Sequence, residues 1–230
     1  MAERASDILA LIPAHNEASR IAPVAAGALA HLPVLVVDDG SADETSEAAR
    51  SAGATVVRQE PNQGKGAALR TGFRWALDNG YRAVVTLDAD GQHDPSEIPK
   101  FVRVYRDHGA DLVIGERDFS LMPPLRRLSN SLGRWAFSWT VGQAVADNQS
   151  GYRLVSRAMM EAALASDERG FEFEVEMIVI AVRRGLRLGS APIRTIYGDE
   201  KSHINNWRHF RKFVGLMWRT RRAMRRADRD

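Results

Sequence analysis

Two carboxylates one residue apart, Asp88 and Asp90, are the residues of this sequence whose spacing most plainly suggests chemistry. They stand in the stretch Leu87–Pro95, which reads LDADGQHDP and adds an amide at Gln92 and an imidazole at His93. A hard divalent cation such as Mg²⁺ prefers oxygen ligands and commonly takes one or two carboxylates, together with phosphate oxygens and water. The stretch therefore indicates a metal–diphosphate site. The alternative is an acidic turn at a strand end, because Asp and Gly are common turn residues.

Two further turns could contact a nucleotide. Asp38-Asp39-Gly40-Ser41 follows an apolar run, and a carboxylate there can accept hydrogen bonds from ribose hydroxyls or from a base N–H. The alternative is that both acids only favour the following helix N-terminus. Gly64-Lys65-Gly66 lacks the spacing of a P-loop, but its backbone N–H groups could approach phosphate while Lys65 adds charge. An ordinary helix-entry turn is the alternative there.

Three arginines, Arg117, Arg126 and Arg127, lie in and after a predicted loop beside the acidic turns. Arginine forks bind phosphate oxygens well, whereas a solvated basic face is the alternative. The lone histidines His15 and His93 are expected to support the structure or the neighbouring ligands rather than to bind a metal themselves.

The elements that must position these residues alternate along the chain. Apolar runs predict strands at 8–12, 34–37, 54–57, 83–87 and 111–115, with helices expected at 18–32, 41–52, 67–79 and 95–108. Short links between them predict an α/β fold with a mostly parallel central sheet and helices on both faces. Because open α/β sheets bind ligands at the carboxyl ends of their strands, the acidic and glycine-rich turns should share one edge.

Some local signals refine this outline. Ser41 and Glu44 have the spacing of a capping box at the start of the second helix, and Pro23 is expected in a kink or an early turn of the first. After residue 115 the pattern loosens into a loop at 116–124 and a polar turn at 147–153 that enters a short strand. Further helices are expected at 125–141, 157–165 and 171–184, and strand character at 186–197 is expected to break at Pro192.

Charge is unevenly distributed along the chain. The formal net charge is +3, but residues 208–230 contain eight Arg, one Lys and two Asp, a net charge of +7 that leaves −4 on the rest. Apolar residues recur there at three- and four-residue steps: Trp207, Phe210, Phe213, Val214, Met217 and Met224. We therefore expect a catalytic domain at 1–204 and a basic amphipathic helix at 205–230 that lies on an anionic membrane surface. A terminal helix docked on the sheet by the same stripe is the alternative.

Composition narrows the possible classes of protein and of site chemistry. The chain has 230 residues and no cysteine, which excludes disulfides, thiolate metal sites and a cysteine nucleophile. No apolar run approaches the ~20 residues of a membrane span, and no cleavable signal is expected. We expect a cytoplasmic protein, peripheral on the inner face of the membrane. No nucleic-acid partner is expected, because the body is acidic and carries no nucleic-acid motif. A non-catalytic binder of nucleic acid or an anionic surface through the basic tail is the alternative from another class.

Eight stretches resemble, in order, the family 2 glycosyltransferases of GT-A fold, and most of all the dolichyl/polyprenyl-phosphate sugar synthases. They are Ile12–Glu17, Val37–Asp43, Asn62–Gly66, Asp88–His93, Gly115–Arg117, Asp147–Arg153, Phe171–Glu174 and Ser202-His203. Two positions differ from the family pattern: His15 stands where tyrosine is common, and Glu116 where serine is common. Many of these relatives carry C-terminal membrane spans, and this chain has none, so the resemblance implies a peripheral enzyme held by its basic helix.

The resemblance implies residue roles. The residues implied at the nucleotide sugar are Pro13, Glu17, Asp39, Lys65 and Asp88. The ligands implied for Mg²⁺ or Mn²⁺ and the donor diphosphate are Asp88, Asp90 and Gln92. The positions that match the lipid-phosphate site are Arg117, Arg127 and Ser131. The catalytic residues implied are Asp90, Arg117 and Arg127.

The activity implied is an inverting, metal-dependent transfer of a hexose from a nucleotide-diphosphate sugar, of the GDP-mannose or UDP-glucose type, to a polyprenyl or dolichyl phosphate. A phosphate oxygen is anionic near neutral pH, so its attack on the anomeric carbon needs no general base. The alternative is a family 2 enzyme that acts on a saccharide or another hydroxyl acceptor. That reaction would require a base, for which Asp147 and Glu174 are the candidates.

Overall fold

The computed structural model describes residues 6–117, 137–145, 147–165 and 173–194. Within these residues, strands form one sheet in the order β3-β2-β1-β4-β6-β5-β7. The strands are β1 (Ile8–Ala14), β2 (Val34–Asp39), β3 (Thr55–Gln59), β4 (Ala83–Thr86), β5 (Leu112–Arg117), β6 (Arg153–Ser156) and β7 (Leu188–Ile193). The helices are α1 (Ile21–Leu29), α2 (Thr45–Ser51), α3 (Lys65–Asp78), the short 3₁₀ helix η1 (Pro95–Glu97), α4 (Ile98–His108), α6 (Arg157–Leu164) and α7 (Phe173–Arg183).

The sheet is mostly parallel, as predicted. Strands β1 to β4 pair in parallel, and so do β5 and β7. Strand β6 is the exception, because it runs antiparallel between β4 and β5. Its first residue, Arg153, therefore pairs with Thr86 at the end of β4 and with Ile114 near the end of β5. The turn before β6 thus reaches the carboxyl edge of the sheet.

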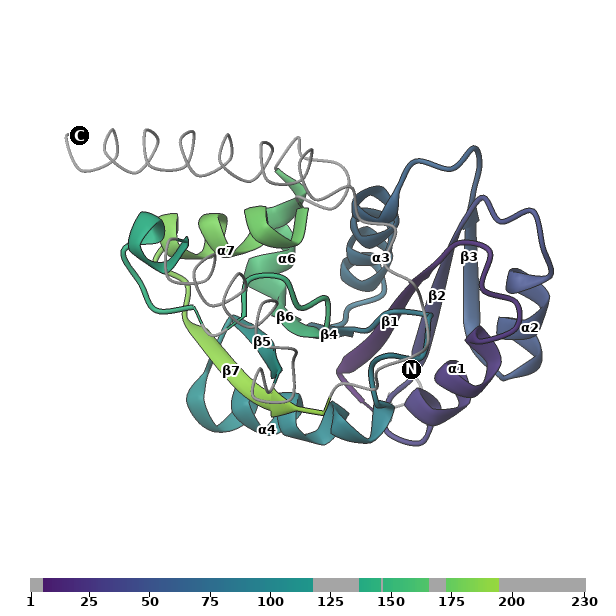
Figure 1. Ribbon diagram of the computed structural model, residues 1–230, viewed down its shortest axis with the longest axis horizontal. Helices are drawn as coiled ribbons and strands as arrows, with labels where there is room; N and C mark the ends of the chain where they lie inside the picture. Colours follow the sequence, from purple (N-terminus) through teal and green to yellow (C-terminus); the bar gives the residue numbers. More distant parts are fainter. Residues whose placement is uncertain (1–5, 118–136, 146, 166–172, 195–230) are drawn as a thin grey trace, which may run out of the picture.

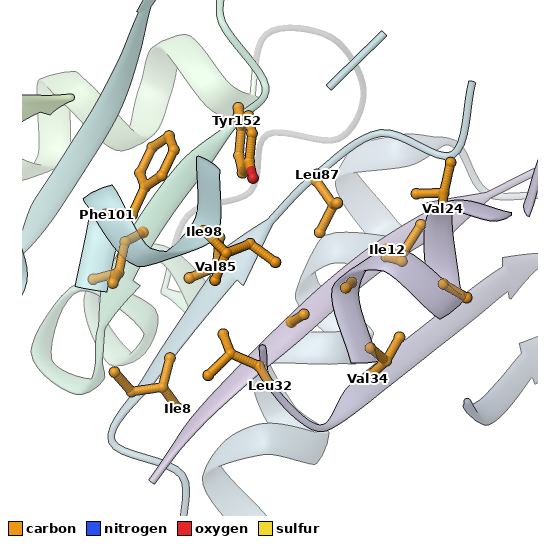
Figure 2. Packing of buried hydrophobic residues seen from close by; sticks show 14 of the residues in the cluster. Ile8, Ile12, Val24, Leu32, Val34, Val85, Leu87, Ile98, Phe101 and Tyr152 are labelled. Atoms are coloured by element: carbon orange, nitrogen blue, oxygen red, sulfur yellow. The ribbon is translucent and has the colours of Figure 1, made fainter. Parts of the chain in front are cut away.

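Helices cover both faces of the sheet, and each face has its own apolar core (Figure 1). Alternate residues of β1 divide between the two cores, as the period of a strand requires: Ile8 and Ile12 lie in one, Leu9 and Leu11 in the other. The first core lies under α1 and α4, and Figure 2 shows its residues from Ile8 and Leu32 at one end to Phe101 and Tyr152 at the other. The second core lies under α3, α6 and α7. The layered α/β prediction is confirmed.

The predicted capping box is wrong. Helix α2 begins at Thr45, and its N-cap residue Glu44 makes no side-chain capping bond. The hydroxyl of Ser41 instead accepts a hydrogen bond from the backbone N–H of Asn16, at 3.0 Å. A contact between two distant turns therefore replaces the local cap that the spacing suggested. Pro23 lies in the first turn of α1, where its missing N–H is tolerated.

The predicted break at Pro192 is also wrong, because β7 runs through it. Within the described residues β7 pairs only with β5, so it lies at an edge of the sheet. A proline is tolerated on an edge strand, where its missing N–H costs no ladder bond. In the described part of the chain, no helix is long and apolar enough to cross a bilayer. The predicted C-terminal helix at 205–230 lies outside the described residues.

Candidate functional site

The turns singled out in the sequence meet at the carboxyl edge of the sheet. Asp39 ends β2, and Asp88 comes two residues after the end of β4. The turn before β6 joins them there, because the hydroxyl of Thr86 donates to the carbonyl of Gly151 at 2.8 Å. The site therefore takes residues from the parallel strands on one side and from the antiparallel strand on the other.

The loop after β4 is held by a hydrogen bond within the loop and by contacts with Tyr152. The backbone N–H of Asp88 donates to Nδ1 of His93 at 3.0 Å. Burial lowers the pKa of His93, which fits a neutral imidazole with Nδ1 as acceptor. Tyr152 packs against the His93 ring, with 4.9 Å between centroids, and its hydroxyl donates to the Asp94 carbonyl at 3.0 Å. His93 is thus a support of the loop, as expected from the sequence.

The Asp88 carboxylate is engaged by a lysine from another element. Nζ of Lys65, the first residue of α3, lies 2.5 Å from Oδ1 of Asp88. Burial alone would raise the pKa of Asp88, but the neighbouring positive groups, Lys65 first among them, together outweigh it and the pKa is lowered. Asp88 is therefore an ionised carboxylate.

Asp90 closes the turn that follows. Its Oδ1 accepts from the backbone N–H of Gln92 at 2.9 Å, across Gly91, whose φ of +80° favours glycine. Asp90 and Gln92 are both partly exposed at the edge of the sheet. The turn thereby brings together the three predicted metal ligands, Asp88, Asp90 and Gln92, on one short loop.

The side chains of this loop suit a hard divalent cation that is only partly coordinated by protein. Among the described residues, no group of three or more His, Cys, Asp or Glu side chains could hold a metal ion. Asp88 and Asp90 supply two carboxylates, which suits a hard cation that completes its shell with diphosphate oxygens and water. Gly151 keeps the space beside them open: a Cβ there would lie 3.0 Å from Oδ2 of Asp88 and 2.9 Å from Nζ of Lys65.

Lys65 has a second carboxylate partner that sequence reasoning missed. Its Nζ lies 2.8 Å from Oε1 of Glu174, at the start of α7. Burial alone would lower the pKa of Lys65, but the two carboxylates outweigh it and raise that pKa. The other oxygen of Glu174, Oε2, is buried and has no hydrogen-bond partner within the described structure. No local pattern links positions 65 and 174, so no sequence signal could have joined them.

Asp39 holds the turn that leads to Lys65. Its Oδ1 accepts from Nε2 of Gln59 at 2.6 Å and from the backbone N–H of Gln63 at 2.8 Å. Its Oδ2 accepts from the backbone N–H of Gly64 at 2.7 Å. The carboxylate, predicted at the nucleotide, is thus used in this structure to shape the Gln63–Gly64 turn, and its nucleotide contact stays a prediction.

Asp38 is fully buried and serves its own turn. Its carboxylate accepts from the backbone N–H of Ser41, at 2.9 Å, and from the hydroxyl of Ser46. Burial would raise the pKa of Asp38, yet these hydrogen bonds lower it overall. Asp38 therefore has a local structural role in this turn.

The first turn of the chain is tied to the second. Oδ1 of Asn16 accepts from the backbone N–H of Ala42 at 2.8 Å, and the backbone N–H of Glu17 donates to the Thr45 hydroxyl at 2.8 Å. Nδ1 of His15 lies 2.8 Å from the Asp39 carbonyl oxygen. Pro13 is buried in β1 beside this turn. Pro13 pairs with Val37 of β2, so the strand and turn that carry Pro13 and Glu17, both predicted at the nucleotide, neighbour the strand that ends in Asp39.

On the opposite side, Arg117 forms a two-pronged pair with Asp147. Its Nε donates to Oδ2 at 2.6 Å and its Nη2 to Oδ1 at 3.0 Å. Asp147 is almost fully buried and also accepts from the backbone N–H of Gln149 at 3.0 Å. The predicted acceptor arginine and one predicted base are therefore partners. Arg126, Arg127 and Ser131 lie outside the described residues.

A fully buried arginine, Arg153, organises this side, and sequence reasoning missed its role. Its Nε donates to the Ser150 carbonyl at 2.7 Å, its Nη2 to the Asn148 carbonyl at 3.3 Å, and its Nη1 to the Glu174 carbonyl. One side chain thereby joins the turn at 147–151 to the start of α7. The sequence signals were its place at the start of the short strand Arg153–Ser156 and at the end of the stretch Asp147–Arg153, and neither pointed to its partners.

Comparisons with known proteins agree with this geometry. A family profile described as Glycosyl transferase family 2 matches residues 10–165. The chain is 32% identical over 205 residues to an undecaprenyl-phosphate mannosyltransferase of Micrococcus luteus, covering 81% of this chain and 82% of that protein. It is 30% identical over 219 residues to a UDP-N-acetylglucosamine–dolichyl-phosphate N-acetylglucosaminyltransferase of Methanococcus voltae, covering 84% and 86%.

A solved structure supports the fold. The glucosyl-3-phosphoglycerate synthase of Mycobacterium tuberculosis, in complex with Mn²⁺, UDP and glucosyl-3-phosphoglycerate, superposes with a TM-score of 0.69. The two sequences are 22% identical, and the match covers 93% of this chain and 77% of that one. The likeness shows that the two chains share a fold.

Proposed function

The chain belongs to glycosyl transferase family 2 and is a glycosyltransferase, and from that premise we propose that it transfers a hexose from a nucleotide-diphosphate sugar to a polyprenyl phosphate. One observation carries the proposal. Two relatives, at 32% and 30% identity over most of both chains, are named for different sugars but for acceptors of one kind, undecaprenyl phosphate and dolichyl phosphate. The acceptor class is therefore better supported than the sugar.

The loop after β4 would hold the donor diphosphate. Asp88 and Asp90, with Gln92 beside them, would bind Mg²⁺ or Mn²⁺, which neutralises charge that grows on the leaving diphosphate. The solved neighbour that contains Mn²⁺ and UDP supports divalent-cation use by this fold. Pro13 in β1, Glu17 in the turn after β1 and Asp39 at the end of β2 would contact the nucleotide.

The other side of the edge would receive the acceptor. Arg117 would position the lipid phosphate together with Arg127 and Ser131, and the buried Asp147 would fix the direction of the Arg117 guanidinium. A phosphate monoester has its second pKa near ~6, so its oxygen is largely anionic at neutral pH. It could attack the anomeric carbon, from the face opposite the diphosphate, without a base.

Contacts of the two candidate bases support this base-free version. Both oxygens of Asp147 accept hydrogen bonds from Arg117. Glu174 is paired with Lys65. Both oxygens of Asp147 and one oxygen of Glu174 are engaged by cationic partners, which favours a phosphate acceptor over a saccharide hydroxyl.

The decisive experiment is incubation of the full chain with labelled GDP- and UDP-sugars, polyprenyl phosphate and Mg²⁺ or Mn²⁺, followed by extraction of lipid. We expect one donor to give a lipid-linked sugar of inverted anomeric configuration, which NMR of the product would identify. The D90N variant serves as the inactive control. Failure of every donor to give lipid-linked product, in a sample shown to be folded, would refute the proposal.

A lipid acceptor would require the enzyme to meet a membrane surface. We propose that the basic segment 205–230 provides this contact, because its net positive charge suits anionic lipid. Flotation of the full chain and of a chain truncated before Trp207 with anionic liposomes tests this. Equal binding by both would contradict the role of the segment.

A further inference from the structure

The ammonium of Lys65 lies between two carboxylates that belong to different parts of the fold. Its Nζ is 2.5 Å from Oδ1 of Asp88, on the loop after β4, and 2.8 Å from Oε1 of Glu174, on α7. The side chains of Asp88 and Glu174 are largely shielded from solvent, with 29% and 9% exposure. Gly151 has no side chain to separate the Lys65 ammonium from Asp88. The lysine is therefore a positive charge built into the predicted cation site.

A cation bound by Asp88 would conflict with this arrangement. The ammonium of Lys65 and a divalent cation would be neighbours on one carboxylate, and like charges at such a distance repel strongly where water is partly excluded. Either the cation binds weakly, or Lys65 releases Asp88.

Glu174 is an alternative partner for the Lys65 ammonium. One of its oxygens already binds Nζ, and the other, Oε2, is buried without a partner within the described residues. A buried acceptor without a partner carries a desolvation cost, and a lysine ammonium has three N–H donors. Lys65 can therefore leave Asp88, keep Glu174 and satisfy its second oxygen by a change of side-chain torsions alone.

We propose that Lys65 is an internal counter-ion that competes with the divalent cation for Asp88 and transfers to Glu174 when cation and nucleoside diphosphate bind together. The cation then binds weakly by itself and tightly with the diphosphate, whose negative charge offsets both positive charges. This inference rests on the proposed cation role of Asp88. It gives Lys65 and Glu174 a positioning and coupling role, and Glu174 ceases to be a candidate base.

The first test measures Mn²⁺ binding to the full chain without nucleotide, from the signal of free Mn²⁺ in electron paramagnetic resonance. In K65M we expect Mn²⁺ to bind about tenfold more tightly than in wild type, because the competing charge-assisted hydrogen bond is gone. R74M is the matched control, since Arg74 is an exposed cation on the same helix. It should bind Mn²⁺ as wild type does.

The second test adds saturating UDP or GDP. In wild type we expect the nucleotide to tighten Mn²⁺ binding, and in K65M this gain should be about tenfold smaller. E174Q probes the other half of the exchange, because without the Glu174 charge Lys65 remains on Asp88. In E174Q, Mn²⁺ binding with nucleotide should weaken, and in the K65M/E174Q double variant the E174Q effect should largely disappear.

The outcomes separate this inference from the proposed function. If folded K65M binds Mn²⁺ as wild type does, or if the E174Q effect persists unchanged in the double variant, the counter-ion role is overturned while the glycosyltransferase assignment stands. If wild type binds no Mn²⁺ with or without nucleotide, both the exchange and the proposed metal site fail.

Discussion

The two sides of the sheet edge are built in different ways. We call them the donor side and the acceptor side after the substrates that we propose they bind. On the donor side, the turns after β1 and β2 fasten to each other through short backbone and side-chain bonds, such as Asn16 to Ser41 and Asn16 to Ala42. On the acceptor side, two arginines make the ties: the buried Arg153 joins the turn at 147–151 to the start of α7, and Arg117 pairs with the buried Asp147. A region held by many single hydrogen bonds tolerates the loss of one of them. A region held by a few buried ionic contacts does not, so mutations on the acceptor side should reduce stability more.

Replacing Arg153 by Met should give the largest effect. The change leaves the carbonyls of Asn148, Ser150 and Glu174 without their buried donor, and each such group costs about 1–3 kcal/mol. We expect a loss of about 3–5 kcal/mol in the free energy of unfolding, measured by urea denaturation.

R153K and R74M sharpen that result. R153K keeps the charge without the planar fork, so it should lose about 2 kcal/mol. R74M removes an exposed cation and should change the unfolding free energy by less than about 0.5 kcal/mol. If R153M were as stable as wild type, the acceptor side would not depend on its buried ions.

On the donor side, D90N should affect chemistry and not folding. Asn keeps an oxygen that can accept from the Gln92 N–H, but it removes one anionic ligand of the proposed cation. We expect the rate of sugar transfer to fall by about 10²–10³-fold while the urea midpoint stays within error. Normal transfer by D90N would remove Asp90 from the catalytic residues.

Replacing Asp147 distinguishes its role in orienting Arg117 from a role as general base. If Asp147 orients Arg117, D147N should raise the acceptor KM roughly tenfold and leave the donor KM unchanged. A general base would behave differently, since its loss lowers kcat by about 10²–10⁴-fold. Steady-state kinetics with each substrate varied in turn distinguishes them. A kcat defect of that size with an unchanged acceptor KM would restore Asp147 as a base.

The smallest effect concerns acid stability on the donor side. The pKa of Asp38 is lower in the folded chain than its ordinary value of 3.8, so the folded state binds fewer protons and stability rises with pH there. The contribution of Asp38 is present above pH ~4 and is lost as pH falls through its lowered folded pKa. D38N should lose about 1–2 kcal/mol at pH 7 and show a flatter decline below pH 4 in urea unfolding. An equally steep decline in D38N would assign the acid sensitivity to other carboxylates.

The donor side was also the part that sequence could predict. The strands 8–12, 34–37 and 83–87, and the acidic turns after them, follow from local apolar runs and from the rule that parallel strands share a carboxyl edge. Where prediction failed there, at the Ser41 cap, a distant residue had taken the hydroxyl that a local rule assigned to the helix.

The acceptor side was less predictable because its contacts join individual side chains that no local pattern connects. Nothing near Arg117 in the sequence selects Asp147 as its partner, and on the donor side nothing near Lys65 points to Glu174. The antiparallel course of β6 was also not foreseen, since a short strand after a loop carries no sign of its direction. Such pairings become visible only in the folded structure.

The reversed direction of β6 has a consequence for how such an enzyme can diversify. Because β5 ends and β6 begins at the same edge of the sheet, the chain between them leaves and re-enters the framework at one place. Insertions, deletions or rewritten stretches in that connection need not disturb the register of any strand. Since the proposed acceptor residues Arg127 and Ser131 belong to that connection, variation there would alter the acceptor under the proposed function while the strands that carry the donor side keep their register.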